Sequence, residues 1–414
     1  MFTIVRFPQN SIRSRLDKIR QFWSNEGPGG DCFWLLDLFT LVGGINSATT
    51  CRFKWGHYIR YLSNSVYLYL GFVFLLQVIH SLQHQKDDVT LVVFECLKLF
   101  IYIVAVTKIL MLAHVQKPVA IVKNFIIGNS VTSGNDSFDE LEQRMFENRA
   151  RTTIKLSIAM ILSNVVAFSV PNSATEKVLG LPPLLQGFRQ PMSSILRYLA
   201  IYCIPLGLVS RFFTNFTTLV TLLLGMRAKL RMLAYRFAQI LVQTGVDADY
   251  TLERIDRDLR ATLGQQMEYW RVLNDLKHLV GKLFFLVHYS SVFTVGAFLF
   301  NALQTGMNIF SAQLASGAVF FLLEHYFQCS LVETLQDEVD TIGDIIYELC
   351  AKLPYSKEHH SEYVQMRSSL MIIWMNTISG VSMSSYGLSN ISTLTFVDLA
   401  HTAYAVLTFF TSVG

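Results

Sequence analysis

The feature that most constrains this chain is a stretch of 41 residues, 283–323, that contains no Asp, Glu, Lys or Arg. A helix needs about 20 mostly apolar residues to cross the hydrocarbon core of a bilayer, which is roughly 30 Å thick. The stretch is therefore long enough for two crossings. Gln304, Gly306 and Asn308 lie near its middle and are typical of a turn. We predict a helical hairpin here, which forms the fifth and sixth spans of a membrane protein.

Four further apolar segments precede this hairpin. Residues 61–79 and 156–175 carry no formal charge, and we predict them as the first and third spans. The second span, 89–114, contains three charged residues, and the fourth, 198–226, contains only Arg211. The last apolar region, 368–414, is charged only at Asp398 and is rich in Gly and Ser at its middle. We expect a short helix, a break and a terminal span in that region. Seven spans are preferred, and eight are the alternative.

The composition agrees with an all-α membrane protein. Charged residues are 15% of the 414 positions, against about 25% in an ordinary soluble domain. This balance argues against a soluble enzyme, and no phosphate-binding loop or HExxH motif is present. His80 and His84 are four apart, but such a pair at a membrane surface is usually a solvated helix end. We expect no catalytic activity, no cofactor and no metal. The net charge of +4 gives no reason to expect a nucleic-acid partner.

The distribution of Lys and Arg predicts the orientation, because loops that stay in the cytoplasm keep these residues. Segments 1–57, 115–153 and 227–282 hold seven, five and ten of them. The alternate segments 81–88 and 176–196 hold one and two. The N-terminus is therefore predicted to be cytoplasmic and, with seven spans, the C-terminus extracellular. No signal peptide is apparent, and the six cysteines predict no disulfide framework.

Two groups of short motifs lie between Leu335 and the C-terminus. The first consists of Asp337-Glu338-Val339, Asp344-Ile345-Ile346-Tyr347 and Leu353-Pro354. The second consists of Leu388-Ser389, Leu394-Thr395-Phe396, Leu399 and Thr402-Ala403-Tyr404-Ala405-Val406-Leu407-Thr408-Phe409-Phe410. Together they resemble the cytoplasmic end of the sixth span and the last helix of insect odorant receptors, whose usual final pattern is close to LS-x-x-TF-x-x-x-L-K-x-SYSxxTLL.

The chain departs from that pattern at several positions. His401 stands where Lys is common, Ala403 and Ala405 replace serines, and Cys350 and Ala351 lie where a Trp is usual. These departures affect the assignment to a subfamily more than the assignment to the family. The TYxxxxxQF ending of the related gustatory receptors is missing. The second cytoplasmic loop, 115–153, lacks the insertion of the family's co-receptor, which implies a ligand-tuning subunit.

The resemblance implies a heterotetramer with the odorant receptor co-receptor, in the plasma membrane of olfactory sensory neurons. Such a tetramer is an odorant-gated, non-selective cation channel with one central pore. The predicted organisation is a cytoplasmic N-terminal segment, 1–57; transmembrane helices 1–6, 58–335; a cytoplasmic anchor region, 336–385; and a pore-lining terminal helix, 386–414. Apolar residues recur at helical intervals in loop 227–282, which predicts helical cytoplasmic extensions there.

The candidate pore residues lie on the terminal helix. Steps of four and three from Ala400 give Tyr404, Leu407 and Thr411, which form one stripe. By resemblance, Leu407 and Thr411 match the constriction, with Phe410 beside it, and we expect Leu407 to be a hydrophobic gate. The alternative is that Leu407 only packs between subunits. Asp398 near the pore mouth would concentrate cations.

The resemblance also places a pocket for a small volatile in the outer half of the second, third, fourth and sixth helices. A volatile needs a largely apolar, enclosed pocket with few polar groups. The candidate lining residues are Val93, Phe94, Leu97, Ser163, Ala167, Phe168, Tyr198, Tyr202, Cys203, Phe320, Phe321 and His325. Their aromatic character is compatible with aromatic or heterocyclic odorants.

Charged residues inside spans need partners. Glu95 and Lys98 are three apart on one helix and can neutralise each other. We expect Lys108 to lie near the cytoplasmic boundary, and Arg211 to face Glu324 or a backbone carbonyl, or else to be solvated. Two other functions remain: a metabotropic, G-protein-coupled-like receptor, and a non-conducting accessory or transport protein.

Overall fold

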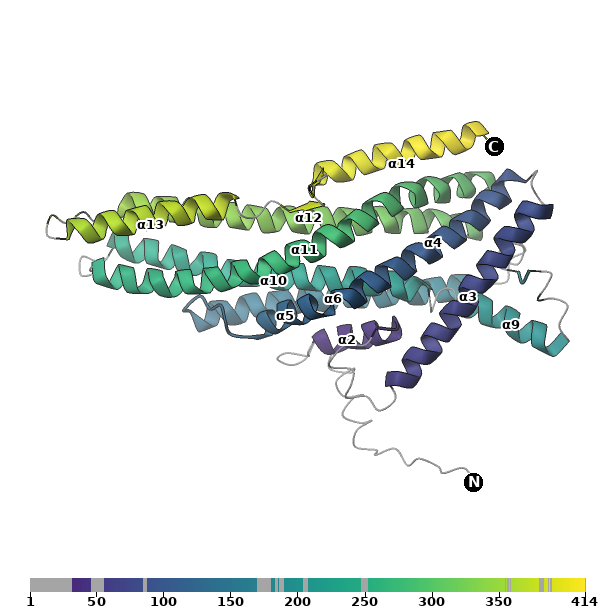
Figure 1. Cartoon of the computed structure of the whole chain (residues 1–414), viewed down its shortest axis with the longest axis horizontal. Coiled ribbons are helices and arrows are strands. Elements are labelled where there is room, and N and C mark those ends of the chain that lie inside the picture. The colour runs from purple at the N-terminus through teal and green to yellow at the C-terminus, as the bar shows by residue number, and fades with distance from the viewer. Residues whose placement is uncertain are drawn as a thin grey trace, which may run out of the picture.

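The structure is a computed structural model that describes residues 32–45, 56–84, 88–169, 180–182, 185, 190–203, 208–246, 252–353, 355, 357, 359–379, 383–385, 387 and 389–413. Within these residues the chain is almost entirely helical (Figure 1). The elements are α2 (Cys32–Val42), α3 (Gly56–His84), α4 (Val89–His114), α5 (Gln116–Ile127), α6 (Asp136–Ser169), α9 (Gln190–Cys203), α10 (Ser210–Val246), α11 (Leu252–Gln304), α12 (Ile309–Lys352), α13 (His360–Ser379), β1 (Ser384–Ser385), β2 (Ser389–Asn390) and α14 (Thr393–Val413).

Three helices run through most of the length of the molecule (Figure 1). They are α10 with 37 residues, α11 with 53 and α12 with 44. At 1.5 Å per residue, α11 is about 80 Å long, well over twice the thickness of a hydrocarbon core. The helices therefore continue far beyond a bilayer. The described part of loop 227–282 is helical, since α10 continues to Val246 and α11 begins at Leu252, and its cytoplasmic position stays a prediction.

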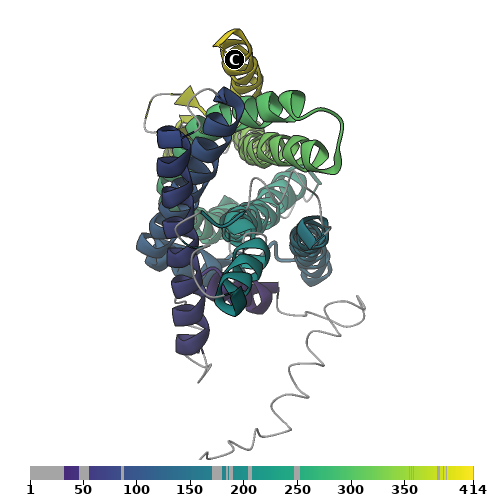
Figure 2. The ribbon, with the colours of Figure 1, turned by 90° about the vertical axis from the view of Figure 1, so that its right-hand side faces the viewer.

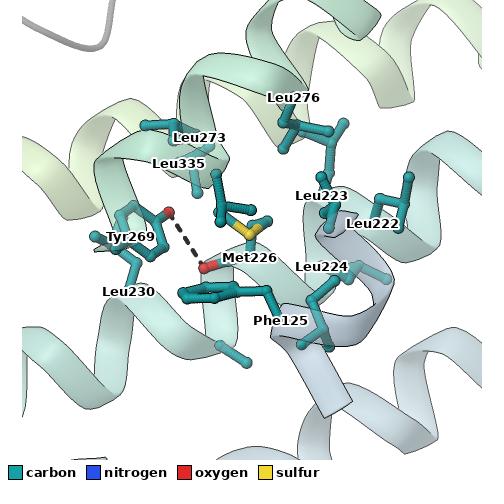
Figure 3. Close-up of a cluster of buried hydrophobic side chains, with 14 of the residues drawn as sticks. Phe125, Leu222, Leu223, Leu224, Met226, Leu230, Tyr269, Leu273, Leu276 and Leu335 are labelled. Atoms are coloured by element: carbon teal, nitrogen blue, oxygen red, sulfur yellow. Dashed lines mark hydrogen bonds between the residues drawn. The ribbon is translucent and has the colours of Figure 1, made fainter. Parts of the chain in front are cut away.

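A large apolar core holds these continuations together. Leu230, Leu233 and Phe237 recur at helical spacing on α10 and are all buried. They pack with α5, α11 and α12 around Tyr269, whose hydroxyl donates to the carbonyl oxygen of Met226 at 3.3 Å (Figure 3). Burial raises the pKa of the Tyr269 hydroxyl, so this donor stays protonated.

Ion pairs flank this core. Arg227 on α10 pairs with Glu338 on α12 at 3.0 Å, and Arg231 pairs with Glu142 on α6 at 3.0 Å. Burial raises the pKa of Glu142, and the neighbouring Arg231 opposes that rise. These ion pairs therefore tie α10 to both α12 and α6 beside the core.

The predicted hairpin is confirmed. Helix α11 ends at Gln304 and α12 begins at Ile309. Gly306 has a φ of +74°, a conformation that few other residues adopt at low cost. The Asn308 side chain accepts from the backbone N–H of Ser311 and caps α12.

Among the described residues, five helices are long and apolar enough to cross a bilayer: α3, α4, α6, α11 and α14. Four of them contain the predicted first, second, fifth and seventh spans, and α6 contains most of the third. The predicted fourth span, 198–226, covers the end of α9 at Cys203 and the start of α10 at Ser210, so its continuity is not tested. Residues 204–207, which include Pro205, lie outside the described residues.

The C-terminal region follows the predicted order of helix, break and helix. Helix α13 packs along α12 at the end of the molecule opposite α3 and α9 (Figure 1). Strands β1 and β2 then pair antiparallel around Gly387, whose φ is +73°. Helix α14 follows and lies at the edge of the bundle, against α11 (Figure 2).

Candidate ligand cavity and terminal helix

A cavity of 240 Å³ lies in the part of the bundle where α11 and α12 are joined. Eight of the 19 described residues that line it are phenylalanines. The lining is formed by Phe74 of α3; Phe94, Lys98 and Ile101 of α4; Met160, Ser163 and Asn164 of α6; Leu208, Val209, Phe212 and Phe213 at the start of α10; Phe298 of α11; and Phe310, Gln313, Leu314, Ser316, Gly317, Phe320 and Phe321 of α12.

Aromatic contacts between helices shape this cavity. The rings of Phe94 and Phe310 join α4 to α12 with centroids 5.5 Å apart. Phe213 and Phe320 join α10 to α12 at 4.4 Å. These separations and tilts are those that aromatic pairs favour. The cavity wall is therefore a connected set of rings that presents apolar surface to a ligand.

One charged group reaches this wall and is neutralised there. Lys98 forms an ion pair with Glu95 at 2.7 Å, as the sequence predicts. Its ammonium also donates to the Gln77 side chain at 2.9 Å and lies 5.4 Å from the centre of the Phe94 ring. Lys98 thus joins α3 and α4 beside the cavity and already has an anionic partner.

A second ion pair lies deeper along the same helices. The Lys108 ammonium contacts both carboxylate oxygens of Glu324, at 2.8 and 2.9 Å, and both side chains are 0% exposed. Lys108 is therefore paired inside the bundle and does not extend to solvent, and its place near the cytoplasmic boundary stays a prediction. The pair ties α4 to α12 in the interior of the bundle.

Arg211 does not pair with Glu324. Its guanidinium donates to the Asn64 side chain of α3 at 2.8 Å and lies 3.6 Å from the centre of the Tyr67 ring. It also contacts the Ser63 carbonyl oxygen at 3.5 Å. Arg211 is buried, so it faces α3 and a backbone carbonyl there and is not solvated.

The structure brings four of the twelve candidate pocket residues into the cavity wall: Phe94, Ser163, Phe320 and Phe321. Val93, Leu97 and Ala167 lie outside this wall on α4 and α6, and Tyr198 on α9 is 61% exposed. The side chains of Phe168, Tyr202 and Cys203 lie outside the described part of the structure.

His325 also lies outside the cavity wall. It is fully buried, and its Nε2 lies 3.4 Å from Nδ1 of His288 on α11. Its ring packs against Phe284 and against Phe396 at the start of α14. His325 therefore belongs to the contact between α12, α11 and α14.

Sequence reasoning missed several residues of the wall. Phe212, Phe213 and Phe298 line the cavity from α10 and α11. Gln313, on the first turns of α12, also lines it. In the sequence, Gln313 stands out only as an uncharged polar residue among apolar ones in the outer half of a span. A polar residue near the turn gives the same pattern, so the sequence did not identify Gln313 as a lining residue.

Helix α14 buries one face against the rest of the subunit. Leu399 and Ala403 are buried, and Phe410 packs against Phe293 and Phe300 of α11 at 5.8 and 5.6 Å. Phe410 thus anchors the helix from the subunit side. The other candidate pore residues are exposed or partly exposed: Asp398, Tyr404, Leu407 and Thr411.

The contact between α11 and α14 depends on Gly296. A Cβ there would lie 2.7 Å from Val406 and 3.0 Å from the carbonyl oxygen of Ala403. We expect Gly296→Leu to force α14 away from α11 and to destabilise the protein by about 1–3 kcal/mol, the usual cost of overpacking. Thermal unfolding of the purified protein measures this. Gly264→Ala on the same helix is the control, since a Cβ there meets nothing within 4 Å; equal stability of both variants would contradict the expectation.

The fold matches solved structures of known proteins. The insect olfactory receptor OR5 from Machilis hrabei aligns with a TM-score of 0.67 and 10% sequence identity, over 92% of this chain and 97% of that chain. The same receptor in complex with eugenol aligns with a TM-score of 0.70 and 11% identity, over the same shares of both chains. No family model and no curated protein matches the sequence. The chain is an all-α protein with the fold of the insect olfactory receptors.

Proposed function

We propose that this protein is an insect odorant receptor, the ligand-tuning subunit of a heterotetrameric, odorant-gated, non-selective cation channel. The observation that carries the proposal is the aromatic cavity between α4, α6, α10 and α12, in a chain with the olfactory receptor fold. A related structure contains eugenol, a small volatile. By analogy, a small volatile binds in the cavity of this protein, which would lie in the extracellular half of the membrane.

The arrangement of the terminal helix supports a role in the pore. Helix α14 leaves one face uncovered by its own subunit, and Asp398, Thr402, Thr408 and Thr411 are exposed on it. Small polar groups suit a water-filled pore better than lipid. Four copies of α14 around one axis would line the pore, with Leu407 as its gate. The outer surfaces of the helical continuations of α10 to α13 would form the contacts between subunits on the cytoplasmic side.

Whole-cell recording over a panel of volatiles tests this proposal. Cells that express the protein with an insect odorant receptor co-receptor should show a ligand-dependent cation current. The absence of such a current, with and without the co-receptor, would discard the channel function. Labelling of both termini separates the metabotropic alternative, since an extracellular N-terminus would support it.

The cavity itself can be tested by filling it. Ser163→Trp adds a bulky ring at the cavity wall, and we expect it to abolish or reduce ligand responses by at least about tenfold, because the ring takes the space of the ligand. The measurement is the concentration dependence of the evoked current, at matched surface expression. Leu162→Trp is the control, since Leu162 is the neighbouring residue, is 55% exposed and lies outside the wall. Equal responses of both variants would show that the ligand binds elsewhere.

A further inference from the structure

Two contacts fix the register between α4 and α12. Lys108 pairs with Glu324, which lies 216 positions later in the chain. Phe94 contacts Phe310, which also lies 216 positions later in the chain, at the cavity wall. The two helices therefore run in the same direction and stay level with each other along the cavity. Gln313 of α12, one turn beyond Phe310, lies at the depth of Lys98 on α4.

Gln313 has an unusual environment for a polar side chain. It lines the cavity, and both its Oε1 and its Nε2 are buried without a hydrogen-bond partner. Buried amide groups are nearly always hydrogen-bonded, because an unmade bond forfeits the hydration that the group had in water. A ligand in the cavity that supplies a donor and an acceptor would restore both bonds.

The other polar groups of the wall already have partners. The Lys98 ammonium is held by Glu95 and Gln77. The Ser163 hydroxyl and the Asn164 amide nitrogen both donate to the Met160 carbonyl oxygen, at 2.9 and 2.8 Å. The Ser316 hydroxyl donates to the backbone carbonyl oxygen of Gln313 at 2.8 Å. Gln313 is therefore the one described residue of this wall whose side-chain oxygen and nitrogen are both buried without any hydrogen bond.

The size and charge of the cavity restrict the ligand further. A volume of 240 Å³ corresponds to about eight water molecules at roughly 30 Å³ each, which is the space of one small organic molecule. An ionised ligand would lack a counter-charge, because Lys98 is already neutralised by Glu95. The aromatic rings around the remaining wall favour a flat apolar body.

We propose that Gln313 selects small aromatic alcohols: neutral molecules with one ring whose hydroxyl group donates to Gln313 Oε1 or accepts from Gln313 Nε2. This selectivity rests on the proposed function, since it concerns the same cavity. Ligands without a hydroxyl enter the same space but leave the carboxamide unpaired. A site that is built to bind a hydroxyl discriminates strongly against an analogue that lacks it.

Matched pairs of ligands test this selectivity. 2-Phenylethanol and propylbenzene have the same shape and differ by a hydroxyl in place of a methyl group, as do benzyl alcohol and ethylbenzene. Binding is measured as ligand-dependent thermal stabilisation of the purified protein, and activation as evoked current. In the wild type, we expect each alcohol to act at a concentration at least about tenfold lower than its hydrocarbon.

Gln313→Met keeps the length of the side chain and removes its hydrogen-bonding groups, so the alcohol and the hydrocarbon should then differ by less than about twofold. Gln313→Asn keeps the amide and should retain part of the preference for the alcohol. It serves as the test variant if Gln313→Met impairs folding. Equal potency of both ligands in the wild type, or an unchanged preference in Gln313→Met, would overturn the proposal. Selective binding without current would overturn the channel function and leave the selectivity intact. Neither binding nor current for any pair would overturn both.

Discussion

Lys108→Met is expected to destabilise the helix bundle by about 3–5 kcal/mol, because it leaves the Glu324 carboxylate buried without a counter-charge. Both partners are completely buried, so neither water nor a neighbouring base replaces the lost ammonium. Few substitutions in this chain should cost more. Size-exclusion chromatography of the detergent-solubilised protein after a heating series measures the loss as a lower temperature of half-survival.

The double variant separates charge from shape. Lys108→Met combined with Glu324→Leu removes both charges, and we expect it to recover most of the stability, since two apolar side chains of similar volume can replace a buried ion pair. Lys352→Met is the control, because its pair with Glu348 is about half exposed and should contribute less than about 1 kcal/mol. A single Lys108→Met variant as stable as the control would contradict this account of the interior.

Leu407→Ser is expected to raise the current without ligand by at least about tenfold. If Leu407 closes the pore by excluding water, a hydroxyl at that position lets the closed pore fill with water. A shift of about 1.4 kcal/mol between closed and open states is enough for a tenfold change. The measurement is the current before ligand is added, normalised to surface expression.

Phe409→Ser on the same helix is the matched control for the gate. Phe409 lies two positions from Leu407, which places it near the opposite side of α14, and it is 62% exposed. The Phe409→Ser variant should leave the current without ligand unchanged. If Leu407→Ser also leaves the closed state unchanged, Leu407 only packs between subunits.

The sequence was sufficient for much of the fold because the membrane imposes a simple rule. The absence of charge over 283–323, with turn residues at its middle, predicted the hairpin of α11 and α12. Helix α4 has the bounds predicted for the second span. Apolar residues at helical intervals after Arg227 predicted the long continuation of α10. Each of these features is local, so it can be recognised without knowledge of the neighbouring helices.

Pairings between distant segments could not be predicted in the same way. Lys108 and Glu324 are 216 positions apart, and only the side-chain contacts between α4 and α12 show that they meet. In the same way, only the contact between α10 and α3 shows that Arg211 is held by Asn64. For this reason only part of the cavity wall could be predicted. Phe94 and Phe320 were found from their position along a span, whereas the role of Gln313 depends on which face of α12 meets α4.

The central claim is that a volatile in the cavity opens a pore formed by this protein and its partner subunits. Outside-out patches with a nucleotide-free pipette solution on their cytoplasmic face, exposed to rapid ligand application, test it most directly. A channel gated by its own ligand requires no cytoplasmic messenger, so we predict ligand-evoked cation-channel openings in such patches, and their loss in Ser163→Trp but not in Leu162→Trp. Currents that occur in whole cells and disappear from every excised patch would contradict the claim and favour a metabotropic receptor.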